Sequence, residues 1–207
     1  IIGAPFNDAG GTNAGRAYIY YGGIIVNSGV DVILTGLAAS DQFGISVSSA
    51  GDVNSDGYSD VIVGANVNDA GGTDAGRAYI YFVGNSPDTI PDVIMTGAAA
   101  GDQFGISVSS AGDVNGDGFS DVIAGAFGND AGGTDAGRTY IYYGGSVMNN
   151  VADGIMTGAV AGDAFGYSVS SADDINGDGF SDVIVGAYLN DAGGSNAGRS
   201  YVYFGGI

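Results

Sequence analysis

The chain has 207 residues and a net charge of −19, from 23 acidic against four basic residues, and every acidic residue is Asp. A surface with this much negative charge attracts cations and repels phosphate backbones and anionic headgroups. We therefore expect no nucleic-acid partner. His, Cys, Lys, Glu and Trp are all absent, which removes imidazole and thiolate metal ligands, the usual nucleophilic triads and Schiff-base chemistry. No apolar run reaches the roughly 18 residues that span a membrane, so no direct membrane insertion is expected.

A repeat of 61 residues organises the chain. The only basic residues are spaced by 61: Arg16, Arg77, Arg138 and Arg199. The aromatic residue of each Phe-Gly pair has the same spacing, at Phe43, Phe104 and Phe165. A fixed period of this length is typical of repeat architectures. We therefore treat 1–207 as one repeat segment, divided into a partial unit (1–36), two full repeats (37–97 and 98–158) and a partial repeat (159–207).

Each unit predicts four short strands. In the first full repeat, residues 44–51 (GISVSSAG) alternate apolar and small polar residues, and 60–65 (DVIVGA) form a continuous apolar run suited to burial on both faces. Residues 76–82 (GRAYIYF) alternate aromatic and aliphatic side chains, and 91–97 (PDVIMTG) read as a shorter strand. Turn residues separate these segments, and no 3.6-residue period is present. The pattern predicts an all-β chain of about three and a half β-propeller blades, each of four antiparallel strands. A parallel β-helix is the alternative, although its rungs are much shorter.

The loop between the first two predicted strands of each repeat concentrates oxygen-bearing side chains. In residues 52–60 (DVNSDGYSD) they stand at loop positions 1, 3, 5 and 9, with Gly57 at position 6 and a backbone carbonyl at position 7. If the backbone curls round one point, these groups form an all-oxygen shell that suits Ca²⁺. Asp, Asn and Gly also dominate ordinary turns, but three copies with a carboxylate at position 9 favour metal binding. We predict three Ca²⁺ sites: Asp52, Asn54, Asp56, Tyr58 and Asp60; Asp113, Asn115, Asp117, Phe119 and Asp121; Asp174, Asn176, Asp178, Phe180 and Asp182.

The loop differs from the helix–loop–helix calcium motif at position 12. That motif needs a bidentate Glu there, whereas this chain has Val63, Ala124 or Val185 inside an apolar strand. We therefore expect position 9 to supply the closing carboxylate, and the metal to clamp a hairpin.

These motifs together resemble a known family. Residues 43–65 (FGISVSSAGDVNSDGYSDVIVGA), followed by GRAYIYF, are similar to the FG-GAP repeat of integrin α-subunit heads, which also occurs in glycosylphosphatidylinositol-specific phospholipase D and in bacterial surface proteins. The resemblance covers essentially the whole chain, although GAP is literal only at Gly3-Ala4-Pro5. It implies a β-propeller with metal loops on one face and ligands, where known, on the opposite face. It also implies that the Phe-Gly pairs pack between blades.

The length indicates an incomplete ring. Seven blades of this period would need about 430 residues, and the chain starts at a point equivalent to mid-strand. We expect either a piece of a longer array or copies that associate.

The predicted function is that of a calcium-binding structural or adhesive module, extracellular or on the cell surface, that self-assembles through its blades with other copies or further repeats. Calcium affinities of about 10⁻⁴–10⁻³ M are typical of extracellular modules. The alternative is a lectin-like or adhesin head that binds a protein or glycan ligand opposite the metal loops.

Three further features have simpler explanations than a ligand site. Each Arg follows a loop with acidic residues, and we expect an internal Asp–Arg pair, such as Arg77 with Asp69 or Asp74. The strand tyrosines are expected to pack in the core rather than to stack on carbohydrate. Asp41, Asp102 and Asp163 repeat identically, which argues against a unique catalytic pair of carboxylates. No enzyme is expected.

Overall fold

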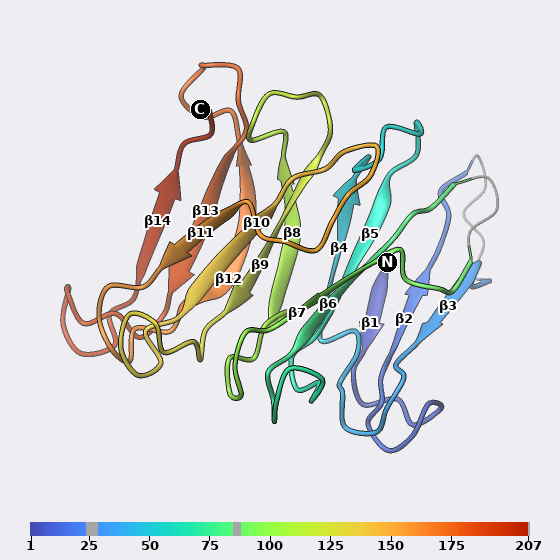
Figure 1. Cartoon of the computed structure of the whole chain (residues 1–207), viewed down its shortest axis with the longest axis horizontal. Helices are drawn as coiled ribbons and strands as arrows, with labels where there is room; N and C mark the ends of the chain where they lie inside the picture. Colours follow the sequence, from blue (N-terminus) through green and yellow to red (C-terminus); the bar gives the residue numbers. More distant parts are fainter. Residues whose placement is uncertain (24–28, 85–87, 207) are drawn as a thin grey trace.

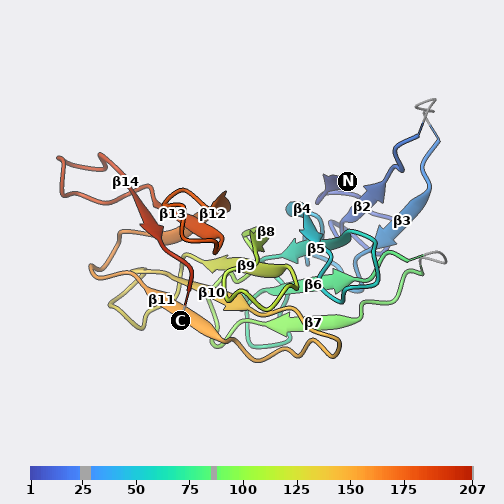
Figure 2. The ribbon, with the colours of Figure 1, turned by 90° about the horizontal axis from the view of Figure 1, so that it is seen from above.

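The protein is described by a computed structural model that covers residues 1–23, 29–84 and 88–206. Over these residues the regular elements are 14 strands in four antiparallel sheets, which stand side by side in chain order (Figure 1). Seen from above, the sheets follow an open arc, with the two ends of the chain in its two outer sheets (Figure 2). No helix among the described residues is long and apolar enough to cross a membrane.

Each sheet takes its strands in sequence order. The first contains β1 (Ile2–Ala4), β2 (Arg16–Ile19) and β3 (Val32–Thr35). The second contains β4 (Ser46–Gly51), β5 (Asp60–Ala65), β6 (Arg77–Tyr81) and β7 (Val93–Thr96). The third contains β8 (Ser107–Gly112), β9 (Asp121–Ala126), β10 (Arg138–Tyr142) and β11 (Gly154–Thr157). The fourth contains β12 (Phe165–Asp173), β13 (Asp182–Ala187) and β14 (Arg199–Tyr203). This up-and-down order confirms the predicted all-β fold of partial and complete propeller blades.

The core lies between neighbouring sheets. Every residue of β5 and of β9 is buried, as their continuous apolar sequences predict. The rings of Phe43, Phe104 and Phe165 are also buried, and each meets two strand tyrosines edge to face at centroid distances of 5.4 to 6.3 Å. The Phe-Gly pairs and the tyrosines therefore serve as packing residues, which confirms that prediction.

The sheets approach one another closely enough to require glycine at one position of each repeat. A Cβ atom built on Gly64 would lie 1.9 Å from the carbonyl oxygen of Gly105 in the next repeat. The same separation holds between Gly125 and Gly166. No side chain fits in such a space, which explains the glycine of the repeated Gly-Ala pair.

Candidate metal-binding loops

The predicted metal loops join the first and second strands of a sheet. Residues 52–59 connect β4 to β5, and residues 113–120 and 174–181 make the same connection in the next two sheets, at the upper edge in Figure 1. Gly57, at loop position 6, has a φ of +90°, and its counterparts in the other loops have φ of +89° and +95°. Position 4 is also left-handed, with φ of +61° at Ser55 and glycine at the other two loops. These two positions curl the backbone into a tight ring.

Backbone amides inside the ring hold the side-chain oxygens of positions 1, 3 and 5. The amide of Asp56 donates to Oδ1 of Asp52 (3.0 Å) and to Oδ1 of Asn54 (2.9 Å), while that of Gly57 donates to Oδ2 of Asp52 (2.9 Å). The amide of Tyr58 donates to Oδ1 of Asp56 at 2.9 Å. The other loops repeat all four bonds at 2.8 to 3.1 Å. Three oxygen-bearing side chains in each loop are thereby turned toward the same few backbone amides.

The carboxylate at position 9 has a different environment. Asp60 is completely buried, and its two oxygens accept hydrogen bonds from the amides of Val53 (3.0 Å) and Val83 (2.9 Å). Asp121 and Asp182 make the equivalent pairs of bonds at 2.8 to 3.0 Å. Burial raises the pKa of Asp60 to about 6 against the effect of the two amides, and the pKa of Asp121 to about 6 for the same reason. Position 9 therefore ties the start of each loop to the end of the third strand.

The structure brings together only part of the predicted ligand set. Among residues 1–23, 29–84 and 88–206, no group of three or more carboxylates is gathered closely enough to hold a metal ion. Positions 1, 3 and 5 share backbone donors at the surface, whereas position 9 lies in the interior. The donor chemistry nevertheless fits a hard cation, because every group is a carboxylate, amide or carbonyl oxygen.

The starts of the first two loops also contact the next repeat, which sequence reasoning missed. The amide of Ser120 donates to the carbonyl oxygen of Asp52 at 3.1 Å, and that of Gly145 to the carbonyl oxygen of Val53 at 2.8 Å. The Val53 side chain is completely buried and belongs to a cluster that includes Val122. The sequence feature that could have indicated this contact is the apolar residue at position 2 of every loop, inside an otherwise polar motif.

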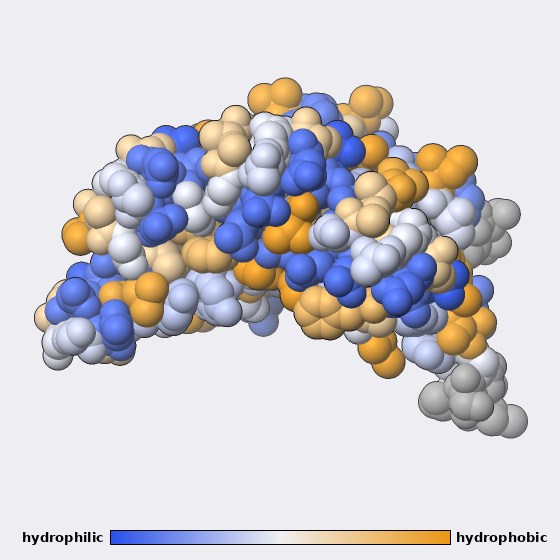
Figure 3. All heavy atoms as spheres, turned by 90° about the horizontal axis from the view of Figure 1, so that it is seen from below, coloured by the Kyte–Doolittle hydropathy of each residue, from blue (hydrophilic) through white to orange (hydrophobic). Residues whose placement is uncertain are grey.

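The opposite edge of the sheets carries buried acid–amide pairs. Figure 3 shows this edge from below, with hydrophilic residues spread across it between small hydrophobic groups. Asp102 is buried there, and its Oδ2 accepts from Nδ2 of Asn129 (3.0 Å) and from the amides of Ala98 (3.1 Å) and Ala99 (3.0 Å). The same Asp–Asn pair recurs in the other two repeats, between Asp41 and Asn68 and between Asp163 and Asn190. Burial raises the pKa of Asp41. The carboxylate of each of these aspartates accepts a hydrogen bond from an asparagine side chain, which supports a structural role.

The prediction of an internal Asp–Arg pair is wrong. Arg77 donates from Nε to the Oγ1 of Thr96, at 3.1 Å, on the neighbouring strand, and Arg16 and Arg138 make the same bond to Thr35 and Thr157. Asp69 instead accepts from the amide of Asp74 at 2.9 Å. The strand register places Arg opposite Thr, so the guanidinium pins two strands rather than the acidic loop.

Comparison with known proteins identifies relatives over most of the chain. The chain is 33% identical over 188 residues to integrin alpha-5 of Xenopus laevis, which covers 84% of this chain and 18% of that protein. It is 32% identical over 174 residues to integrin alpha-PS2 of Drosophila melanogaster, covering 76% of this chain and 12% of that protein. It is 31% identical over 165 residues to human integrin alpha-IIb, covering 75% of this chain and 16% of that protein. The chain thus spans less than a fifth of the length of these relatives.

A sequence profile of the FG-GAP repeat matches three segments, 43–81, 104–142 and 165–203. Each match starts at the phenylalanine of a Phe-Gly pair, contains one complete metal loop, and ends at the last residue of the third strand of its sheet. The three matches cover more than half of the sequence, and the chain belongs to the FG-GAP repeat family.

Proposed function

We propose that the chain is a calcium-binding, extracellular adhesive β-propeller module, with one Ca²⁺ held by each of the loops 52–60, 113–121 and 174–182. The observation that carries the proposal is the recurrence of one hydrogen-bonded ring of oxygens in three loops. Crowded carboxylates repel one another in the absence of a cation. A bound divalent cation supplies the opposing charge, so binding should add to the stability of the fold.

The roles of the loop residues follow from their contacts. In the first loop, Asp52, Asn54 and Asp56 present side-chain oxygens that the loop amides already orient, and Tyr58 offers its carbonyl. Asp60 supports the loop from below by joining its start to the end of β6. The loop start in turn accepts hydrogen bonds from the following repeat. Ordering of the loop is therefore expected to stiffen the contact between neighbouring blades.

A location outside the cell is supported by two arguments. The relatives over most of this chain are integrin α subunits, and loops of this kind in extracellular modules bind calcium at about 10⁻⁴–10⁻³ M. Such loops fill at the calcium levels found outside cells and stay empty in the cytosol. The role requires no catalytic group, and the aspartates of the opposite edge are engaged by amides.

Association through the blades is the second part of the proposal. Equivalent surfaces recur every 61 residues. Surfaces that repeat at a fixed spacing can stack on equivalent surfaces of further repeats or of other copies. The expected partners are other copies of the chain or further repeats of the same family.

A ligand-binding head is the second candidate function. Its support is an aromatic pair found only in the last repeat: Tyr167 and Tyr188 are both exposed, with ring centroids 4.3 Å apart. The other repeats have Ile at the position of Tyr167. An exposed aromatic pair on the edge opposite the metal loops could receive a glycan or a peptide.

Light scattering in millimolar Ca²⁺, repeated after chelation, separates the two candidates. Calcium-dependent assembly predicts a mass well above one chain that falls when calcium is removed. A single-chain mass under both conditions would contradict the assembly and would favour the ligand-binding head.

A further inference from the structure

Neighbouring metal loops are connected by a single peptide group. The proposed metal ligand at loop position 7 is a backbone carbonyl oxygen, and the N–H of the same peptide group belongs to position 8. The position 8 amide of the second loop, Ser120, donates to the carbonyl oxygen of Asp52 at 3.1 Å. That of the third loop, Ser181, donates to the carbonyl oxygen of Asp113 at 2.9 Å. Each acceptor is the residue at position 1 of the preceding loop, which is itself a proposed metal ligand.

A planar peptide group can transmit orientation from one loop to the next. In a trans peptide the C=O and the N–H point in opposite directions and rotate together. A cation bound to the Phe180 carbonyl in the third loop therefore fixes the direction of the Ser181 N–H, which is bonded to Asp113 in the second loop. The cation also polarises this peptide group and so strengthens the hydrogen bond. Filling the third loop thus holds a ligand residue of the second loop in place.

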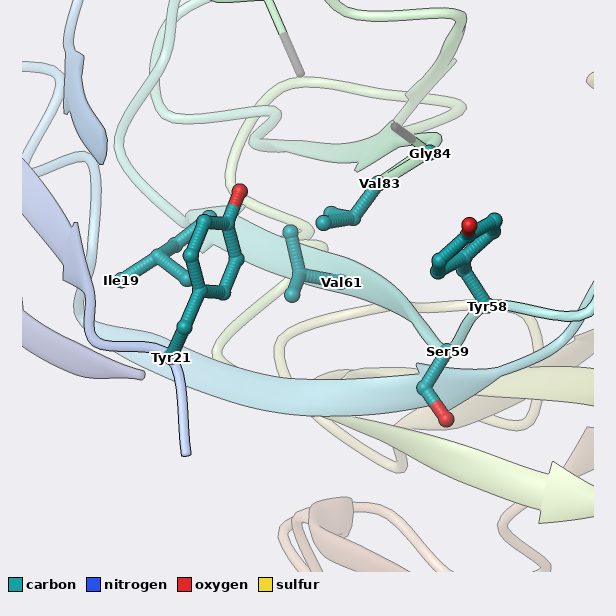
Figure 4. Close-up of a pocket in the computed structure, with 7 residues that line it drawn as sticks. All are labelled: Ile19, Tyr21, Tyr58, Ser59, Val61, Val83 and Gly84. Carbon is teal, nitrogen blue, oxygen red and sulfur yellow. The ribbon is translucent and has the colours of Figure 1, made fainter. Parts of the chain in front are cut away.

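The aromatic side chain at position 7 packs on the preceding loop. Phe180 is partly buried, although residues 173–179 before it are exposed. A Cβ atom built on Gly116, at position 4 of the second loop, would lie 2.5 Å from Cε1 of Phe180, so the aromatic side chain lies against the backbone of that loop. An aromatic residue occupies position 7 in all three loops. Figure 4 shows positions 7 and 8 of the first loop, Tyr58 and Ser59, at one end of an open cavity, where their side chains point in opposite directions.

A second connection between loops runs through the carboxylate at position 9. Asp182 accepts a hydrogen bond from the amide of Gly205 at 2.9 Å. The next amide, that of Gly206, donates to the carbonyl oxygen of Val114, at position 2 of the second loop, at 2.8 Å. The second loop is joined to the first by the same path, which starts from Asp121. Each of these loops therefore holds the preceding loop at two adjacent backbone acceptors.

We propose that the three metal sites are coupled: filling one loop with calcium raises the calcium affinity of the loop next to it. Phe119 with Ser120, and Phe180 with Ser181, are the positioning residues that carry the effect. The coupling deepens the proposed calcium-binding function and rests on it. Because coupling between sites is reciprocal, the second loop gains from both neighbours. In the part of the chain that the structure describes, no backbone hydrogen bond joins the first loop to the third, so these two act on each other through the second.

Direct electrostatics acts in the opposite direction. Two bound divalent cations repel each other, and this repulsion alone would make a filled loop weaken its neighbour. At about 0.15 M salt the Debye length is about 8 Å, so repulsion between exposed sites is screened, whereas the backbone contacts remain. The sign of the effect therefore distinguishes the two mechanisms.

Calcium binding resolved by loop tests the coupling in the full chain. Calcium is added in steps at about 0.15 M salt, and hydrogen exchange at the position 5 amides of Asp56, Asp117 and Asp178 reports the filling of each loop. Asp178→Asn removes a ligand of the third loop. We expect the calcium concentration that half-fills the second loop to rise at least about twofold, which corresponds to a coupling of at least about fivefold between sites of similar affinity. The first loop should shift less. Asp117→Asn should weaken both the first and the third loop.

A second pair of variants assigns the coupling to the position 7 side chain. Phe180→Ala keeps every proposed ligand of the third loop, including the backbone carbonyl. In this background Asp178→Asn should shift the second loop less than it does in the unmodified chain, and a double-mutant cycle measures the difference. Phe204→Ala is the matched control, because it removes an aromatic side chain that is 64% exposed from the same edge of the same sheet. We expect this control to leave the shift unchanged.

Hydrogen exchange at Ser181 reports on the connecting peptide group itself. In the Asp117→Asn chain, filling of the third loop should slow exchange of the Ser181 amide, because the bound carbonyl fixes its direction. Unchanged exchange at Ser181, or equal effects of Phe180→Ala and Phe204→Ala, would overturn the assignment of the positioning residues.

The same experiment reports separately on the proposed function. Loops that fill with calcium independently, or a filled loop that weakens its neighbour, would overturn the coupling and leave calcium binding intact. An absence of calcium-dependent protection in all three loops would contradict the proposed function and the coupling with it.

Discussion

The aspartates at the two edges of each sheet have different environments. At the lower edge, Asp102 is buried and satisfied by an amide side chain and two backbone amides. At the upper edge, each loop places two carboxylates at the surface, at positions 1 and 5, and a third just below them. At the lower edge, the protein's own hydrogen-bond donors satisfy the buried aspartate. The upper edge keeps uncompensated negative charge, and we expect its stability to depend on a cation.

Calcium removal should have the largest effect and should act on the upper edge only. At a calcium concentration ten times the dissociation constant, each site contributes about 1.4 kcal/mol, so three sites contribute about 4 kcal/mol. Chelation should lower the unfolding temperature accordingly, as measured by circular dichroism at constant ionic strength. Hydrogen exchange should speed up at the amides of Asp56 and Gly57 but not at those of Ala98 and Ala99. Equal changes at both edges would show that calcium stabilises the whole sheet and not the metal loops in particular.

Asp102→Ala should destabilise the protein by about 2–4 kcal/mol, because it leaves buried donors without an acceptor. The loss should be the same with and without calcium, which distinguishes this edge from the loops. Urea unfolding under both conditions measures it. Asp135→Asn, at an exposed aspartate of the same edge, is the matched control and should change stability little. A calcium-dependent loss at Asp102 would show that the two edges are coupled.

Asp117→Ala should cost about 1.4 kcal/mol in calcium through loss of one site. In chelator the same variant should be neutral or slightly stabilising, because it relieves repulsion from Asp113. The reversal between the two conditions is the signature of a metal ligand, and thermal unfolding in each buffer reveals it. An equal loss in both buffers would mean that Asp117 only supports the turn.

Ser55→Gly should have the smallest effect and should stabilise the first loop by up to about 1 kcal/mol. Ser55 has a φ of +61°, where the other two loops have Gly116 and Gly177. The reverse change, Gly177→Ala, meets no atom within 4 Å and should cost a similar amount through backbone strain alone. Chemical denaturation of both variants tests the pair, and effects of the same sign would refute the strain argument.

Local features of this fold could be read from the sequence, and long-range pairs could not. The apolar run at 60–65 predicted a buried strand, because composition and period determine such a feature. The family resemblance implied that Phe43 and its repeats pack between sheets. The convergence of loop positions 1, 3 and 5 was also predictable, since these residues are close in sequence. The two bonds of Asp60 were not, because Val83 is 23 residues away and reaches it only through strand register. The partner of Arg77 was missed for the same reason.

The contact between the starts of the first two loops and the next sheet was the least predictable feature of the site. Val53 stands in a polar motif, and only the placement of neighbouring blades shows that its side chain is buried and its carbonyl is bonded to Gly145. Such contacts depend on the spacing between sheets, which the repeat length does not specify.

A calorimetric titration of the calcium-free chain with Ca²⁺ tests the metal assignment of the three loops. We expect three sites per chain, with dissociation constants of about 10⁻⁴–10⁻³ M, and two sites in the Asp117→Ala variant. A chain that takes up no calcium, or a variant that still binds three ions, would contradict the assignment of these loops.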